Sequence, residues 1–172
     1  MSLLDVKDLK TYFYTDSGVA KAVDGVTFSV DKGKVLGIVG ESGCGKSVTS
    51  LSIMRLVDPV TGKNEGGEIL FDGTDILKLP EPEMRKLRGN RISMIFQDSG
   101  AMINPIRKIG SQYVEYIRAH KNISKKDAFD MAVEMLEKMR LPDGKRIMES
   151  YPFELSGGQK KRVAIAGVLA MN

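Results

Sequence analysis

The sequence predicts an α/β fold, and three observations support this prediction. Short apolar runs of strand length fill the opening third and recur at residues 35–40, 68–73 and 91–97. From residue 105 onward, apolar residues instead recur at helical spacing. A buried-strand pattern, a glycine-rich loop and a helical pattern follow one another from residue 35 to 57. This order is typical of a parallel sheet whose strands alternate with helices.

The composition is that of a folded protein, with 42% hydrophobic and 28% charged residues in a chain of 172. The N-terminus lacks a basic segment followed by an apolar run, and no stretch approaches the roughly 20 apolar residues that a bilayer helix needs. We therefore expect a cytosolic or peripheral protein. The net charge of +4 suits an anionic ligand, but the lysines and arginines are scattered, so no nucleic-acid partner is expected. The single cysteine, Cys44, cannot form an internal disulfide.

The opening third predicts a β subdomain. In "AKAVDGVTFSV" the apolar residues alternate for the most part with polar ones, as in a half-buried strand: Val23, Val26, Phe28 and Val30. The continuous apolar run at 35–40 predicts a short buried strand, and a helix follows from Ser47 to Val57. The turn residues of "VDPVTGKNEGG" end that helix. A strand over 68–73, a short helix stopped by Gly89 and an apolar strand over 91–97 complete this part.

Beyond Pro105 we expect helices over Ile109–His120 and Ser124–Met139, the second capped by Ser124 with Asp127 responding. "LPDGKR" breaks the second helix, and Tyr151 is extended because it precedes a proline. Ser156 is placed to cap a final helix. The residues of that helix that can face a core are Val163, Ile165, Ala166, Leu169 and Ala170.

"GESGCGKS" fits the phosphate-loop pattern, with the strand before it and the helix after it that the pattern requires. Its glycines let the backbone curl so that N–H groups point inward at a polyphosphate. Lys46 reaches the terminal phosphates, and the Ser47 hydroxyl is placed to ligate Mg²⁺. A glycine turn that merely joins a strand to a helix would need neither residue. The predicted nucleotide-binding residues here are Gly40, Glu41, Ser42, Gly43, Cys44, Gly45, Lys46 and Ser47.

"LSGGQ" forms a second predicted anion cradle. Ser156 at a helix start exposes its hydroxyl, and the N–H groups of Gly157 and Gly158 follow it, with Gln159 beside them. One nucleotide does not need two such cradles in one chain, whereas two facing copies would.

With these two motifs the sequence resembles the ATP-binding-cassette (ABC) family, in which the signature of one subunit closes on the ATP held by the phosphate loop of its partner. The resemblance implies a P-loop NTPase fold of ABC type. It places an N-terminal antiparallel β subdomain at 1–34, the core from the P-loop to the Q-loop at 35–104, an inserted helical subdomain at 105–155 and the signature helix at 156–172.

Two more positions match the family. Gln97, at the end of "ISMIFQ", is similar to the Q-loop glutamine, which senses Mg²⁺ and the attacking water; with Lys46 it is the catalytic pair that the resemblance implies. The aromatic run "TYFY" lies where the family stacks adenine on a ring, and the alignment of "VKDLKTYF" favours Phe13. Tyr12 or Tyr14 could hold that place instead.

The sequence looks most like the oligopeptide, dipeptide and nickel import ATPases, although Phe153 stands where those usually have histidine. The resemblance implies an ATPase subunit that uses ATP and Mg²⁺ to power uptake of peptides or a related small solute. Its partners would be transmembrane permease subunits and a second ATPase subunit, at the cytoplasmic face of the membrane. The alternatives are a nucleotide-binding fragment that does not hydrolyse ATP and a non-transport ABC ATPase.

The sequence stops soon after the signature motif. In the family the signature helix leads into a strand with the Walker B aspartate and a catalytic glutamate, followed by a switch histidine, and none of these has a counterpart in the 172 residues. We therefore expect the N-terminal portion of a longer cassette. Its parallel core sheet would be incomplete, because the resemblance places the Walker B strand between residues 35–40 and 91–97. Two apolar strand edges would then lack a neighbour.

We predict that these 172 residues alone hydrolyse ATP poorly, since a general base or water-positioning carboxylate typically contributes about 10²–10⁴-fold to the rate. Phosphate release at saturating ATP measures this. Steady-state turnover comparable to that of a complete cassette would refute the prediction.

Overall fold

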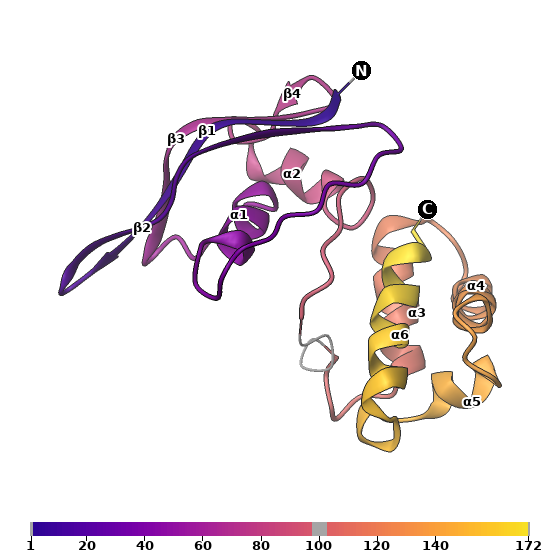
Figure 1. Cartoon of the computed structure of the whole chain (residues 1–172). Helices are drawn as coiled ribbons and strands as arrows, with labels where there is room; N and C mark the ends of the chain where they lie inside the picture. Colours follow the sequence, from indigo (N-terminus) through magenta and orange to yellow (C-terminus); the bar gives the residue numbers. More distant parts are fainter. Residues whose placement is uncertain (1, 98–102, 172) are drawn as a thin grey trace. The chain divides into compact units, whose positions relative to one another are not determined.

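The computed structural model describes residues 2–97 and 103–171, so predictions that fall on residues 1, 98–102 and 172 lie outside the described residues. The chain divides into two compact units, residues 1–85 and residues 86–172, and each is described by itself (Figure 1). Within the described ranges, no helix is long and apolar enough to cross a membrane.

The first unit is a sheet with a short helix against one face (Figure 1). Strands β1 (Ser2–Thr15), β2 (Gly18–Asp31), β3 (Gly62–Phe71) and β4 (Thr74–Asp75) pair antiparallel in the order β2-β1-β3-β4. Helix α1 (Lys46–Ile53) follows the glycine-rich loop, and α2 (Glu81–Leu87) begins at the end of the unit. The expected alternation in β2 is present, because every second residue from Val26 to Val30 is partly buried. The predicted antiparallel sheet is therefore present, and it includes β3 and β4 as well as the strands within residues 1–34.

The turn predicted after the first helix is shorter than expected, because β3 already begins at Gly62. Glycine and asparagine have low strand propensity, but Gly62 lies opposite Phe13, and Asn64 opposite Thr11, in the ladder with β1. Pairing with a long neighbouring strand overrides local propensity here. Gly67 keeps its turn-like backbone, with a φ of 92°, at an irregularity in this pairing.

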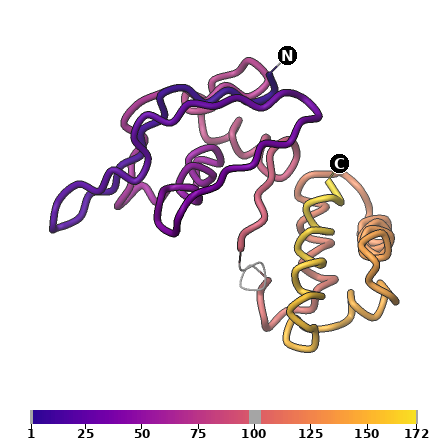
Figure 2. Tube along the Cα trace, in the orientation of Figure 1, coloured from indigo at the N-terminus to yellow at the C-terminus, as the bar shows by residue number. Residues whose placement is uncertain are grey.

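The buried strands predicted at 35–40 and 91–97 are not formed in the described structure. Residues 34–41 run from β2 to α1 without strand pairing (Figure 2), and Val35 and Val39 are 98% and 93% exposed. The second segment makes one isolated bridge, between Arg88 and Ile92. The reason is that a strand's hydrogen bonds come from its neighbours, and among the described residues no strand lies beside either run. Each apolar run is present, but the described residues contain no strand that pairs with it.

The second unit is a bundle of helices: α3 (Ile109–His120), α4 (Lys125–Lys138), α5 (Gly144–Glu149) and α6 (Gly157–Leu169), with the 3-10 turn η1 (Pro152–Glu154) before α6. Helices α3 and α6 lie side by side (Figures 1 and 2), and the Tyr113 hydroxyl donates to the carbonyl oxygen of Val163 across them. Burial raises the pKa of Tyr113. One apolar core fills the bundle, and its most buried large side chains are Ile109, Ile117, Leu136, Leu141, Ile147, Met148 and Val163.

The helix predictions hold with small changes. Helix α3 has the predicted bounds, and α4 begins one residue after its predicted cap. The Ser124 hydroxyl oxygen accepts from the N–H of Asp127 at 3.1 Å, and the Asp127 carboxylate answers by accepting from that hydroxyl at 2.7 Å. Val163 and Ala166 of α6 and its C-cap residue Ala170 are buried as expected. Leu169 is 39% exposed because it does not share the buried face of those three residues. Helix α5 was not predicted.

We predict that Leu136→Ala lowers the free energy of unfolding of the helical unit by about 2–5 kcal/mol, because truncation of a buried leucine loses apolar burial and leaves a cavity. Leu136 is fully buried in the bundle core. Urea denaturation followed by circular dichroism measures the change. Glu134→Ala on the same helix is the control, since its pair with Lys138 is exposed and exposed pairs contribute little. Equal effects of the two substitutions would contradict the assignment of this core.

Candidate functional site

The glycine-rich loop is held in a conformation that only glycine allows at two positions. Gly43 has a φ of 83° and Gly45 a φ of 92°. A Cβ atom at Gly45 would also lie 2.4 Å from the carbonyl oxygen of Ala22 on β2, which is closer than any real contact of this kind. Gly45 is the N-cap of α1. The loop therefore presses against β2 where the helix begins.

The Lys46 side chain curls over this loop. Its ammonium group donates to the carbonyl oxygens of Gly40 and Glu41, at 2.7 and 2.6 Å, and lies 3.4 Å from the Cys44 sulfur. An ammonium group has three donors, so these contacts account for all of them. The positive charge of Lys46 thus lies against the backbone of the loop.

The N-terminus of α1 adds to the positive potential of the loop. The helix dipole places partial positive charge at this end, and the first turn of α1 contains no acidic residue. Ser47 is exposed there. The Thr49 N–H and hydroxyl both bond the carbonyl oxygen of Gly45, at 2.8 and 3.0 Å, and so close the first turn. Lys46, Ser47 and the loop amides are together suited to a polyphosphate.

The register of the sheet separates the three candidate aromatic residues. Phe13 lies opposite Gly62 and shares a face with Thr11, the face against which α1 packs through Ser52. Its ring lies close to Gly62, as Val57 does just after α1. Since side chains alternate along a strand, Tyr12 and Tyr14 lie on the opposite face.

The two tyrosines are engaged by carboxylates on that opposite face. The Tyr12 hydroxyl donates to Asp24 at 2.6 Å, and the Tyr14 hydroxyl donates to Glu65 at 2.5 Å. The hydrogen bond from Tyr12 holds the pKa of Asp24 below its usual value, and the bond to Asp24 raises the pKa of Tyr12. Of the three rings, Phe13 is the one on the side of the phosphate loop helix.

The second motif is a capped helix start. The Ser156 hydroxyl oxygen accepts from the N–H of Gln159 at 3.3 Å, and the Gln159 side-chain oxygen accepts from the N–H of Ser156 at 2.8 Å. This is a capping box, and the spacing S-x-x-Q is typical of one. An accepting hydroxyl can still donate its own proton. A Cβ atom at Gly157 or Gly158 would meet nothing within 4 Å, so their backbone is open to a ligand.

The predicted site residues fall in both units. The loop from Gly40 to Ser47 and Phe13 belong to the first unit, whereas Gln97 and the Ser156–Gln159 turn belong to the second. Gln97 is exposed at the end of the segment 91–97. The structure thus brings together the members of each motif.

The donors available to Mg²⁺ are oxygens. The Ser47 hydroxyl is exposed at the helix start, and Gln97 offers an amide oxygen. No cluster of three or more histidine, cysteine or acidic residues that could hold a metal occurs in the described part of the chain. Mg²⁺ binds readily through one or two protein oxygens together with waters and substrate phosphates, so the Ser47 hydroxyl fits a Mg²⁺ ion bound with a nucleotide. Gln97 belongs to the other unit and stays a predicted ligand.

The sequence profile of the ABC transporter family matches residues 23–172. The chain belongs to this family. It is 49% identical over 168 residues to a probable peptide ABC transporter ATP-binding protein of Sinorhizobium fredii, and 48% identical over 170 residues to the oligopeptide transport ATP-binding protein OppD of Bacillus subtilis. These alignments cover 98% and 99% of this chain but 50% and 48% of the relatives, so the chain spans about half the length of the curated relatives it matches.

Solved ABC structures share this fold. A dimeric ATP-binding cassette, MJ0796, bound to ADP and Pi superposes with a TM-score of 0.85 at 26% identity, over 98% of this chain and 70% of that chain. The cassette cbiO1 of Clostridium perfringens, part of the complex cbiONQ, superposes with a TM-score of 0.72 at 26% identity, over 99% and 62%. The P-loop NTPase fold of ABC type is therefore confirmed.

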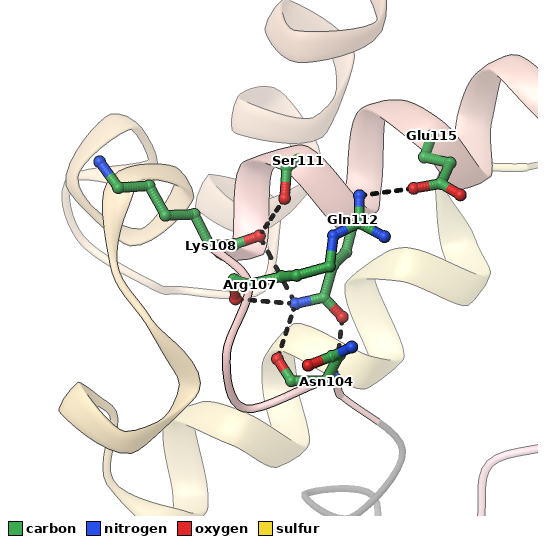
Figure 3. A network of polar contacts seen from close by, with 6 residues as sticks. All are labelled: Asn104, Arg107, Lys108, Ser111, Gln112 and Glu115. Atoms are coloured by element: carbon green, nitrogen blue, oxygen red, sulfur yellow. Dashed lines mark hydrogen bonds and ion pairs between the residues drawn. The ribbon is translucent and has the colours of Figure 1, made fainter.

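Two polar networks near the ABC motifs were not predicted from the sequence. One is the buried contact between Thr11 and Ser52. The other lies at the start of α3, where the Gln112 amide accepts from the N–H of Asn104 at 2.9 Å and donates to the carbonyl oxygens of Asn104 and Arg107, at 3.1 and 3.0 Å (Figure 3). Gln112 thereby holds the turn that leads into the helical unit. A single glutamine among polar residues carries no sequence signal for such a role.

Proposed function

We propose that this chain is the nucleotide-binding part of an ATPase subunit that powers an importer of peptides or a related small solute. The observation that carries the proposal is the loop from Gly40 to Ser47, whose two positive-φ glycines, Lys46 ammonium group and helix start fit a triphosphate. The high identity to peptide transport ATP-binding proteins supports the choice of transport over other ABC functions.

Binding of ATP requires Lys46 to exchange partners. Its ammonium group bonds two neutral carbonyl oxygens of the loop, and a phosphate oxygen adds the attraction between two opposite full charges. A phosphate oxygen therefore replaces at least one of those carbonyls. The Ser47 hydroxyl would hold Mg²⁺ beside the phosphates, and Gln97 is the second ligand that the family resemblance implies; the metal would supply positive charge that neutralises the phosphates.

The second cradle acts on a neighbouring subunit. The γ-phosphate of the ATP held by a partner ATPase subunit is contacted by Ser156, Gly157, Gly158 and Gln159. Two subunits thus close over two nucleotides. The open backbone at the two glycines supports this role. Hydrolysis reopens the pair, and the helical unit passes the motion to transmembrane permease subunits. The assembly works at the cytoplasmic face of the membrane, with this chain as a peripheral part.

We predict that the chain binds Mg²⁺-ATP and that Lys46→Ala weakens the affinity at least about tenfold, because a hydrogen bond to a charged group is worth about 1.5–3 kcal/mol. Isothermal titration calorimetry measures the affinity. Lys78→Ala is the charge-matched control, since Lys78 is exposed and pairs with Asp75. Absence of ATP binding to the unmodified chain, or an equal loss in both variants, would overturn the nucleotide-binding function.

Co-purification with permease subunits tests the proposed role in transport. We predict that the chain co-purifies with the permease subunits of a peptide importer expressed beside it. Permeases of an ABC exporter, co-expressed in the same way, are the control. Recovery with the exporter permeases alone, or with neither set, would contradict the importer assignment while leaving ATP binding intact.

A further inference from the structure

Two buried hydroxyl groups join the sheet to the phosphate loop helix. Thr11 on β1 and Ser52 on α1 are both fully buried, and their side-chain oxygens are 2.8 Å apart. The Thr11 hydroxyl also donates to the side-chain oxygen of Asn64 on β3, at 2.8 Å. Because Thr11 gives its one proton to Asn64, the Ser52 hydroxyl is the donor to Thr11, and it shares that proton with the carbonyl oxygen of Val48, 2.8 Å away and one turn back in its own helix. The three polar side chains thus connect two strands to one helix.

Helix α1 depends on such contacts for its place against the sheet. Its eight residues have two buried members, Thr49 and Ser52, and both are polar. Apolar burial is non-directional and tolerates sliding, whereas a hydrogen bond fixes distance and angle. The Thr11 contact therefore determines where along β1 the helix sits.

Both ends of the proposed nucleotide site are close in sequence to this contact. Phe13 follows Thr11 by two residues on the same face of the sheet, as the pairing of Thr11 with Asn64 and of Phe13 with Gly62 requires. Ser47 and Lys46 begin the helix that carries Ser52. The Thr11–Ser52 hydrogen bond is thus one of the contacts that connect the strand carrying the aromatic ring to the helix carrying the phosphate ligands.

We propose that Thr11 and Ser52 are positioning residues that set the distance between the base-stacking ring of Phe13 and the phosphate loop. The inference rests on the proposed function, since it assumes that ATP occupies this loop with its base on Phe13. Neither residue touches the nucleotide. Their effect is to let one ligand reach both contacts at once, and it is absent for a ligand that uses the phosphate loop alone.

Two probes distinguish these cases. ATP engages both the ring and the loop, whereas inorganic tripolyphosphate engages the loop alone. We expect Thr11→Val to weaken ATP binding about fivefold, the equivalent of one typical hydrogen bond, and to leave tripolyphosphate binding within about twofold. Thr11→Ser keeps the hydroxyl and restores ATP affinity. Ser50→Ala is the matched control, because the Ser50 hydroxyl bonds within α1, to the carbonyl oxygen of Lys46 at 3.3 Å.

The double variant Thr11→Val with Phe13→Ala tests whether Thr11 acts through the ring of Phe13. Once the ring is absent, its spacing no longer matters, so Thr11→Val causes no further loss of ATP affinity in the Phe13→Ala background. Additive losses would overturn the inference, because contacting residues that act through one another are non-additive. Parallel loss of ATP and tripolyphosphate would also overturn it, since that result describes a damaged loop.

Four further results would each bear on the inference or on the proposed function. If Thr11→Val fails to fold, Ser52→Ala deletes the same bond from the helix side, where alanine has the higher helix propensity, and the same two probes apply. If Phe13→Ala leaves ATP affinity unchanged, the base does not stack there and the inference is overturned. If the unmodified chain binds tripolyphosphate and ATP equally, the inference fails while the phosphate loop stands. If it binds neither, the proposed function itself fails.

Discussion

The close approach of Gly45 to Ala22 is the constraint on which the proposed nucleotide site depends. The space between the loop and β2 is too small for a side chain, since a Cβ atom would come within 2.4 Å of a carbonyl oxygen. Helix α1 begins at the next residue, so this contact sets its starting point and the place of Lys46. The Thr11–Ser52 hydrogen bond fixes a later turn of the same helix. A helix of eight residues held at two points has a defined direction, which the phosphate loop requires.

The second motif depends much less on its surroundings. Its geometry arises from a capping box between residues three apart, and such local bonds need no partner from elsewhere in the fold. The helix behind it is then secured by a buried stripe and by end contacts. The Lys121 ammonium donates to the carbonyl oxygen of Ala170 at 3.1 Å, near the C-terminal end of α6. The start of the helix presents backbone groups while its body is anchored in the bundle.

The apolar segment before the glycine-rich loop, unlike the capped helix start, depends on a partner from elsewhere in the fold. Val35 and Val39 have the side chains of a buried strand, yet they are exposed and unpaired in the described structure. Hydrophobic content specifies that a segment should be buried, but the backbone pairing that makes it a strand is supplied by another segment. The long β1 ladder has the reverse effect on β3, where glycine and asparagine become strand residues because β1 lies beside them.

The sequence by itself determined the features whose physics is local. The glycines of "GESGCGKS" specify a tight loop before α1, Ser124 and Ser156 specify helix starts, and the spacing of apolar residues gave the bounds of α3. Only the tertiary structure decided which of three aromatic residues lies on the side of α1, because the face of a strand residue depends on the register with its neighbour. It also decided the Thr11–Ser52 contact, which joins residues 41 apart, since hydroxyl side chains carry no pattern that names a distant partner.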